Sequence, residues 1–343
     1  MSGFDEASYS ALPSPPLDSV SCLRFSPTNP DHLLVSAWDS TVRLYNTSDE
    51  NGSQPDMKTK FEHRAAVLAC SFSQDGQRAY SGGLDACVRE LDLNSEKMTV
   101  LGSHEDSVSS MTCVSGNHSL ITGSWDRTLR FFDPRASTPQ QSSHSTPDRI
   151  YAIDHINNTL VVAMASRLFH IYDIRKMDAP AQQRESSLKY MTRSLACMPD
   201  GQGYATASVE GRIAVEYFDP SPAAQEKKYA FKCHRVTDPA TGVDHVYPVN
   251  SLSFHPVYNT FASAGSDSTV SIWDHKVKKR LRQYPKLPGP VAGVAFSCDG
   301  RKLAVGVSYT WDEGEEGMRR DGVVPWVGVR KVGDEVKPKS WSG

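Results

Sequence analysis

Residues 123–133 read Gly123-Ser-Trp-Asp-Arg-Thr-Leu-Arg-Phe-Phe-Asp133, a Trp-Asp pair followed by a short segment rich in apolar residues. Related stretches run from Ser36 to Tyr45 (Ser-Ala-Trp-Asp-Ser-Thr-Val-Arg-Leu-Tyr) and from Gly265 to Asp274 (Gly-Ser-Asp-Ser-Thr-Val-Ser-Ile-Trp-Asp). Short apolar segments bounded by Gly, Asp and Ser are typical of β-strands joined by tight turns. The three copies indicate that the chain is built from a repeated β unit.

The repeat extends over nearly the whole chain. Seven units begin at residues 20, 67, 108, 150, 192, 249 and 291, separated by 47, 41, 42, 42, 57 and 42 residues. This spacing matches the roughly 40–45 residues of a WD-type blade, and each unit holds segments for four short antiparallel strands. Radial stacking of such blades gives each one buried neighbours. We therefore predict an all-β protein formed by a single seven-bladed WD40 β-propeller.

The predicted propeller spans residues 17–333, between an N-terminal segment (1–16) and a C-terminal tail (334–343). A ring of blades needs closure, and the segment from Tyr9 to Leu12 is a candidate outer strand for the last blade. A disordered N-terminal tail is the alternative.

Composition excludes several classes of function. The 343 residues contain 40 acidic and 37 basic side chains, for a formal net charge of −3, so no global positive field favours direct nucleic-acid binding. No apolar stretch approaches the roughly 20 residues that span a bilayer, and no signal peptide is evident, so we expect no membrane association. Seven cysteines without a Cys-x-x-Cys pair predict reduced thiols and neither a disulfide framework nor a metal site.

Catalytic and cofactor motifs are also lacking. The sequence contains no phosphate-binding loop, no dinucleotide fingerprint, no nucleophile elbow and no His-Glu-x-x-His pair. We therefore predict a non-enzymatic interaction platform that uses no cofactor.

Two histidines recur with the repeat. His63 precedes Asp85 by 22 residues, and His104 precedes Asp126 by 22. This spacing allows a histidine before the first strand of a blade to hydrogen-bond an aspartate in the turn between the second and third strands. Because the pair repeats and has no nucleophile beside it, we interpret both as structural ties and not as catalytic pairs.

Antiparallel blades predict which side chains share a face. The turn between strands two and three lies at the same end as the start of strand one of the next blade. That end receives Trp38 and Trp125, the Glu210-Gly211-Arg212 turn, Arg193, and a long loop from Asp219 to Val249 that contains Lys232. His234 and Arg235 are in the same loop, and Arg235 is a further candidate for the basic group. Tryptophan and arginine are enriched in binding hot spots, so we expect this face to bind partners. The cations from Lys276 to Arg282 fall on the opposite face, as a solvated turn.

Several motifs resemble one family closely: Ser186-Ser-Leu-Lys-Tyr190, Val209-Glu-Gly-Arg-Ile-Ala-Val-Glu-Tyr217, Asp219-Pro-Ser-Pro222, Lys228-Tyr-Ala-Phe-Lys-Cys-His-Arg235 and Tyr247-Pro-Val-Asn-Ser-Leu-Ser-Phe254. They resemble the family of the third Bub protein, the WD-repeat subunit of the mitotic spindle assembly checkpoint. The resemblance extends from about Pro16 to the Lys337-Pro-Lys-Ser340 tail.

The resemblance implies a checkpoint adaptor at the kinetochore, in the nucleus and also in the cytoplasm. Its implied partners are the GLEBS segments of the Bub checkpoint kinase and its Mad or pseudokinase relative, phosphorylated Met-Glu-Leu-Thr repeats of the kinetochore scaffold, and the inhibitor assembly of the anaphase-promoting complex. By position in the family motifs, Arg212 and Lys232 match the cations that bind phosphothreonine. Arg193 and Trp38 match GLEBS-binding positions, to which we add Trp125 by symmetry of the repeat. Met191 departs from the family pattern, in which Gln is common at this position.

Two other functions remain open. The related WD protein of mRNA export shares the Glu-Gly-Arg and Phe-Lys-Cys-His-Arg motifs and binds a nucleoporin GLEBS segment. A substrate receptor of a cullin ubiquitin ligase is the alternative from another class, because Phe132-Asp-Pro-Arg135 and Tyr172-Asp-Ile-Arg175 resemble the W-D-x-R box of such receptors.

Overall fold

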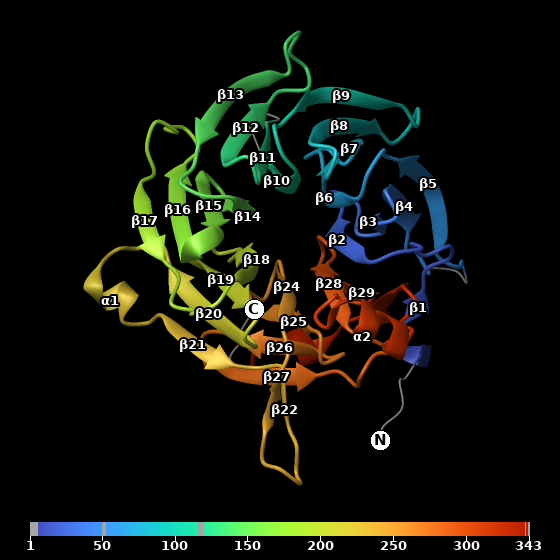
Figure 1. Ribbon diagram of the computed structural model, residues 1–343, viewed down its shortest axis with the longest axis vertical. Helices are drawn as coiled ribbons and strands as arrows, with labels where there is room; N and C mark the ends of the chain where they lie inside the picture. Colours follow the sequence, from blue (N-terminus) through green and yellow to red (C-terminus); the bar gives the residue numbers. More distant parts are fainter. Residues whose placement is uncertain (1–5, 50–52, 115–118, 340, 342–343) are drawn as a thin grey trace.

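Seven four-stranded antiparallel sheets surround a central opening in the computed structural model (Figure 1). The structure describes the whole chain except residues 1–5, 50–52, 115–118, 340 and 342–343. Parts of the predicted N-terminal segment and C-terminal tail therefore lie outside the described residues. The arrangement confirms the seven-bladed β-propeller.

The innermost strand of every blade begins at the residue where a repeat unit was predicted to begin. These strands are β2 (Val20–Phe25), β6 (Val67–Phe72), β10 (Val108–Cys113), β14 (Ile150–Ile156), β18 (Thr192–Cys197), β24 (Val249–Phe254) and β28 (Val291–Phe296).

The remaining strands follow outward in chain order. The second strands are β3 (His32–Ala37), β7 (Arg78–Gly83), β11 (Leu120–Ser124), β15 (Thr159–Met164), β19 (Gly203–Ser208), β25 (Phe261–Gly265) and β29 (Lys302–Val307). The third strands are β4 (Thr41–Asn46), β8 (Cys87–Asp92), β12 (Thr128–Phe132), β16 (Leu168–Asp173), β20 (Arg212–Tyr217), β26 (Val270–Asp274) and β30 (Trp326–Lys331). The outer strands are β5 (Asp56–Glu62), β9 (Met98–Ser103), β13 (Gln140–Ser145), β17 (Gln182–Glu185), β21 (Tyr229–Lys232), β27 (Lys279–Gln283) and β1 (Ser10–Ala11).

Apolar side chains from neighbouring blades form the core. One cluster joins Val35 of blade 1 to Ala304 of blade 7, and another joins Val42 of blade 1 to Phe72 of blade 2. All six residues of β19 are buried, because a middle strand is covered by blades on both of its faces. Burial between blades is therefore the main stabilising contribution, and it fixes the inner strands around the central channel.

The ring is closed by both ends of the chain. Ser10 and Ala11 of β1 pair with Val329 and Gly328 of β30, so the N-terminal segment supplies the outer strand of blade 7 (Figure 1). The Leu12 N–H donates to the Val327 carbonyl over 2.9 Å, and the Leu12 side chain is buried.

Segments outside the regular blades complete the fold. In the C-terminal tail, a short 3-10 helix (Asp334–Val336) buries Val336, whose carbonyl accepts a hydrogen bond from the Thr260 hydroxyl. Helix α2 (Gly314–Asp321), which is rich in charged residues, lies between β29 and β30 of blade 7. Helix α1 (Pro222–Gln225) precedes β21. A hairpin of β22 (Arg235–Thr237) and β23 (Asp244–Val246), between blades 5 and 6 in chain order, projects outward past β27 (Figure 1).

One of the two predicted histidine ties is present. His104 is buried, and its Nδ1 lies 2.9 Å from the Asp126 carboxylate while its Nε2 lies 2.8 Å from the Thr122 hydroxyl. A tie that the sequence analysis missed joins His234 to Asp267 over 2.8 Å. These two residues are separated by more than 22 positions because the β22–β23 hairpin lies between them.

The predicted tie between His63 and Asp85 is wrong. The Asp85 carboxylate instead accepts hydrogen bonds from both terminal nitrogens of Arg89, at 3.0 and 2.6 Å. His63 Nε2 lies 2.7 Å from the Ser81 hydroxyl. The guanidinium of Arg89, four residues after Asp85, offers a planar pair of donors that matches the carboxylate better than one imidazole N–H.

Burial of His63 predicts acid sensitivity. Burial, helped by the nearby charge of Arg89, lowers the pKa of His63 to about 4, whereas an unfolded histidine titrates near 6.5. As the pH falls, the unfolded chain therefore takes up the proton before the folded chain does. The contribution of neutral His63 to the free energy of unfolding is complete above pH 6.5 and is lost as the pH falls toward 4. The loss amounts to about 3 kcal/mol.

We expect His63→Gln to flatten this part of the pH dependence. Denaturant titrations at pH 7 and pH 4.5 measure it, and the free energy of unfolding of the variant should fall less between them than that of the wild type. Equal slopes for the two proteins would contradict the assignment.

Candidate functional site

The face of the disc where the innermost strands begin is called here the top face. The turns between second and third strands open onto it, and so do the connections between blades. At its centre lies a cavity of about 740 Å³ over the mouth of the channel. Residues from several blades line this cavity, including Trp38, Trp125 and Arg193. The three residues predicted to bind a GLEBS segment thus surround one cavity.

The two tryptophans occupy equivalent turns. The Trp38 N–H donates to the Ser19 carbonyl over 2.9 Å, and the Trp125 N–H donates to the Ser107 carbonyl over 3.0 Å. These hydrogen bonds tie each turn to the residue just before an innermost strand. The indole of Trp38 is 44% exposed, an unusual exposure for so large an apolar side chain, and apolar surface of this kind is typical of binding sites.

A third tryptophan lines the cavity together with Trp38 and Trp125. Trp311 of blade 7 lines the same cavity, is 48% exposed, and packs edge-on against Tyr309 with ring centroids 5.7 Å apart. The sequence analysis did not assign it to the site. The signal was only partial, because Trp311-Asp312 repeats the Trp-Asp pair after a second strand but is separated from β29 by residues 308–310, whereas Trp38 and Trp125 directly follow their strands.

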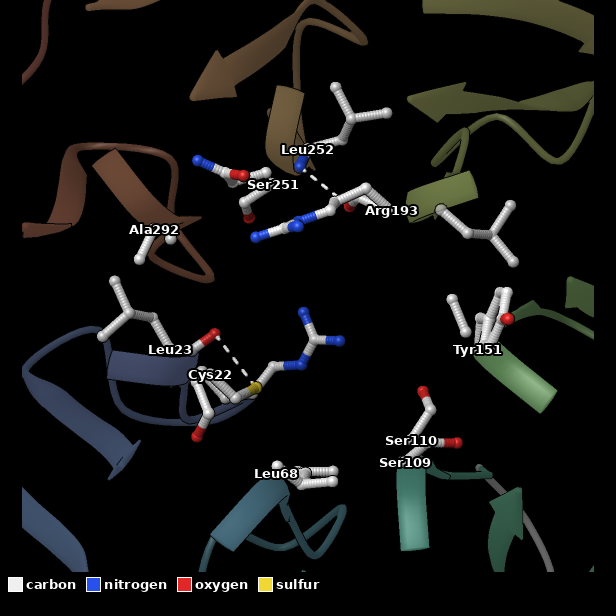
Figure 2. Close-up of a pocket in the computed structure, with 18 of the residues that line it drawn as sticks. Cys22, Leu23, Leu68, Ser109, Ser110, Tyr151, Arg193, Ser251, Leu252 and Ala292 are labelled. Atoms are coloured by element: carbon white, nitrogen blue, oxygen red, sulfur yellow. Dashed lines mark hydrogen bonds between the residues drawn. The ribbon is translucent and has the colours of Figure 1, made fainter. Parts of the chain in front are cut away.

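Arg193 supplies positive charge at the mouth of the channel. It is the second residue of β18, and its side chain points into the channel space toward Ser251 in Figure 2. The Asp312 carboxylate lies 4.0 Å from its guanidinium and also accepts a hydrogen bond from the Thr310 hydroxyl over 2.7 Å. An acidic ligand at Arg193 therefore has to compete with Asp312.

The cavity narrows downward into the channel. Below it lies a space of about 130 Å³ bounded by innermost strands, with Leu68, Ser109 and Ser110 across the space from Ser251 (Figure 2). Arg193 lines both spaces, so they are continuous.

The two predicted phosphothreonine-binding cations are cross-strand neighbours. Arg212 begins β20 and pairs with Lys232, which ends β21. Arg212 is about one third exposed, and its Nε lies 3.5 Å from the Glu210 carboxylate. Lys232 is exposed, and no hydrogen bond or ion pair of its ammonium group is found among the described residues. Lys232 ends a strand, so its predicted position in a loop is wrong.

Arg193, Arg212 and Lys232 form a radial row on blade 5. They stand at the top ends of its first, third and fourth strands. At about 4.8 Å between strands, Arg212 is roughly 10 Å and Lys232 roughly 14 Å outward from Arg193. We call these three residues the cation row.

Arg235 does not extend the cation row as a free charge. Its Nη2 donates to the Glu210 carbonyl over 2.9 Å, and its Nη1 lies 4.0 Å from the Asp244 carboxylate of the hairpin. The arginine thereby holds the β22–β23 hairpin against the turn that precedes Arg212.

Neither a metal-binding group nor a membrane-spanning helix is found among the described residues. Within these residues, no group of three or more His, Cys, Asp or Glu side chains is placed to hold a metal ion. In the same part of the chain, no helix has the length and apolar character needed to cross a membrane. The basic stretch 276–282 begins in the turn at the opposite end of blade 6 and continues along the outer strand β27, so only its first residues lie on the predicted face.

Comparison with known proteins places the chain among characterised relatives. The WD domain, G-beta repeat family matches residues 12–46, 56–90, 95–133 and 229–274. Mitotic checkpoint protein BUB3.1 of Arabidopsis thaliana is 48% identical over 96% of this chain and 94% of its own length. Mitotic checkpoint protein bub3 of Dictyostelium discoideum is 43% identical over 92% of this chain and 93% of its own.

Two further likenesses are more distant. The mRNA export factor GLE2 of Chaetomium thermophilum is 35% identical over 96% of this chain and 92% of its own. The solved structure of U3-55K superposes with a TM-score of 0.75 over 96% of this chain and all of its own, at 16% identity, which supports the fold alone. The identity to the two checkpoint proteins, over nearly their whole length, leads to one conclusion. The chain belongs to the family of WD40-repeat Bub3 mitotic checkpoint proteins.

Proposed function

We propose that this chain is a non-catalytic adaptor whose top face reads two kinds of peptide at the kinetochore. One is the GLEBS segment of the Bub checkpoint kinase and of its Mad or pseudokinase relative. The other is the phosphorylated Met-Glu-Leu-Thr repeat of the kinetochore scaffold. Binding both recruits the checkpoint complex to unattached kinetochores and contributes to the inhibitor assembly of the anaphase-promoting complex. The protein then acts in the nucleus and on chromosomes, and also in the cytoplasm.

The cavity at the channel mouth supports the GLEBS part of the proposal. Trp38, Trp125 and Trp311 offer apolar contact area, and Arg193 offers a guanidinium for an acidic side chain. Arginine and tryptophan in such a setting carry most of the binding energy of an interface. The Asp312 carboxylate, 4.0 Å from the Arg193 guanidinium, is displaced when an acidic side chain of the ligand binds there. Because of this competition, partners with little acidic character bind less well.

The cation row is the single observation that carries the phosphothreonine part. A phosphate group brings about −1.5 to −2 charge and three acceptor oxygens. Arg212 and Lys232 are cross-strand partners at one sheet edge, so both reach one phosphate group, and an unmodified threonine hydroxyl gains little from them. Kinase activity then becomes a recruitment switch.

Glu210 modulates this site and yields a prediction. Its carboxylate lies 3.5 Å from Arg212 Nε and accepts the Lys189 N–H over 3.1 Å. Glu210→Gln keeps an acceptor for Lys189 but removes the charge that competes with phosphate. A partly exposed pair of this kind is worth up to about 1 kcal/mol, so phosphopeptide affinity should rise by up to about fivefold.

Fluorescence anisotropy with a labelled phosphorylated Met-Glu-Leu-Thr peptide measures this change. Asp219→Asn, which makes the same charge change in the turn below β20, serves as the control and should leave affinity unaltered. A Glu210→Gln variant that binds no more tightly than this control would show that the phosphate does not lie at Arg212.

An mRNA-export adaptor is the second candidate. It is favoured by the 35% identity to GLE2 over nearly the whole chain. This function uses the cavity for a nucleoporin GLEBS segment and leaves Arg212 and Lys232 without a phosphopeptide. Co-purification with nucleoporin and RNA, and not with the checkpoint kinase, would favour it.

The ubiquitin-ligase alternative rests on two arginines that have local roles. Arg135 pairs with Asp133 through two nitrogens at 3.0 and 2.9 Å, and Arg175 pairs with Asp173 at 2.8 and 2.6 Å. Both stabilise the turn that follows a third strand. We therefore do not propose this function.

A further inference from the structure

Cys22 occupies an unusual position for a structural cysteine. It is the third residue of β2, is half-buried, and lines the 130 Å³ space of the channel (Figure 2). This space is continuous with the open cavity of the top face, so small polar molecules have a path to the sulfur.

A second thiol lies beside it. Cys70, on β6 of the next blade, lines the same space, and Cys22 packs against the core cluster that contains it. Cys22 Sγ also lies 3.9 Å from the Cys70 carbonyl oxygen. The pair therefore joins blades 1 and 2 at the channel wall.

An arginine faces the same space, with the carboxylate of Asp154 on β14 as a negative charge that acts on it. Arg24 is exposed to the channel, and no hydrogen bond or ion pair of its guanidinium is found among the described residues. Among the neighbouring groups, the side chain of Cys70 has the largest effect on the pKa of the Cys22 thiol, and it lowers this pKa. Burial opposes it, the positive charge of Arg24 adds to it, and together they lower the pKa of Cys22 to about 6. Reactive cysteines are found in accessible, electropositive surroundings of this kind.

We propose that Cys22 is a peroxide-reactive thiol and that Cys70 is its resolving partner, both acting inside the central channel of the propeller. This inference is independent of the peptide-binding function. It concerns residues of β2 and β6 that are not among the predicted peptide-binding residues, although Arg193 of the cation row lines the same space.

The chemistry needs only a peroxide as oxidant. The Cys22 thiolate attacks one oxygen of hydrogen peroxide, the O–O bond breaks, and the products are Cys22 sulfenic acid and hydroxide. The Cys70 thiol then attacks the Cys22 sulfur, its proton combines with the departing hydroxyl to give water, and a disulfide forms. Two electrons pass from the two thiols to the peroxide.

The first test uses two other half-buried thiols, Cys87 and Cys298, as references within the same chain. The folded full-length protein is alkylated with iodoacetamide between pH 5 and pH 9, and the rate at each cysteine is followed by peptide mass spectrometry. We expect the Cys22 rate to level off above about pH 7, because its thiolate is then fully formed, while the reference rates rise steadily. A Cys22 rate that still rises tenfold between pH 7 and pH 8 would overturn the proposal.

The second test adds hydrogen peroxide and looks for a peptide that links Cys22 to Cys70. Arg24→Gln should move the midpoint of Cys22 alkylation to higher pH and slow the formation of this link. Arg149→Gln, which removes an exposed arginine from the top face, should change neither. Oxidation of Cys22 without a link to Cys70, or equal behaviour of the two variants, would contradict the assignment.

Discussion

Replacing both Arg212 and Lys232 with alanine should abolish the preference for phosphorylated over unmodified Met-Glu-Leu-Thr peptide. Each cation contributes a charge-assisted contact worth about 1.5 to 3 kcal/mol, so affinity for the phosphopeptide should fall by at least about 100-fold. Affinity for the unmodified peptide should change little. Calorimetric titration of wild type and variant with both peptides measures the difference.

The control removes the same two charges from the other face. Lys276 lies in the turn after β26 and Lys279 begins β27, so both are at the end of blade 6 opposite the top face, and both are exposed. Their double alanine variant should bind the phosphopeptide like the wild type. Comparable losses in the two double variants would mean that net charge alone, and not the cation row, drives binding. An unchanged affinity of Arg212→Ala/Lys232→Ala would refute the site.

Arg193→Ala and Trp38→Ala should each weaken binding of a GLEBS segment by about 30-fold or more, corresponding to about 2 kcal/mol for a hot-spot residue. Removing Arg193 takes away the positive charge of the channel mouth and leaves Asp312 to repel an acidic segment. Removing Trp38 takes away an apolar surface that is 44% exposed in the free protein.

Matched variants separate binding from stability. Arg149 lies just before β14 on the same face but does not line the cavity, and Trp341 is 38% exposed and packs against Tyr258 at the other end of the disc. Arg149→Ala and Trp341→Ala should therefore bind GLEBS normally. A loss at Trp38 no greater than that at Trp341 would remove Trp38 from the binding surface. Thermal unfolding of all four variants checks that the propeller stays folded.

The repeat made most of the fold predictable from the sequence. Apolar strands and Trp-Asp turns are set by neighbouring residues, which is why all seven innermost strands begin at the predicted positions. The β22–β23 hairpin was missed because its strands contain charged and polar residues without a buried face. Helix α2 was missed because its sequence reads only as a charged stretch.

Within the candidate site, the face shared by the tryptophans and cations followed from strand direction alone. The carboxylates that lie beside these arginines could not be predicted from the sequence. Asp312 comes close to Arg193, and Glu210 to Arg212, only because of how the turns are arranged in the folded protein. The wrong pairing of His63 with Asp85 has a similar cause. Spacing identifies which groups can meet, but competition from Arg89 decides which ones do.

The most direct test of the account is a calorimetric titration of the wild-type chain with phosphorylated and unmodified Met-Glu-Leu-Thr peptide, in the presence and absence of a GLEBS segment. The account predicts that the GLEBS segment binds and that only the phosphorylated peptide binds. Binding of the GLEBS segment with no binding of either Met-Glu-Leu-Thr form would contradict it and make the export-type adaptor the better description.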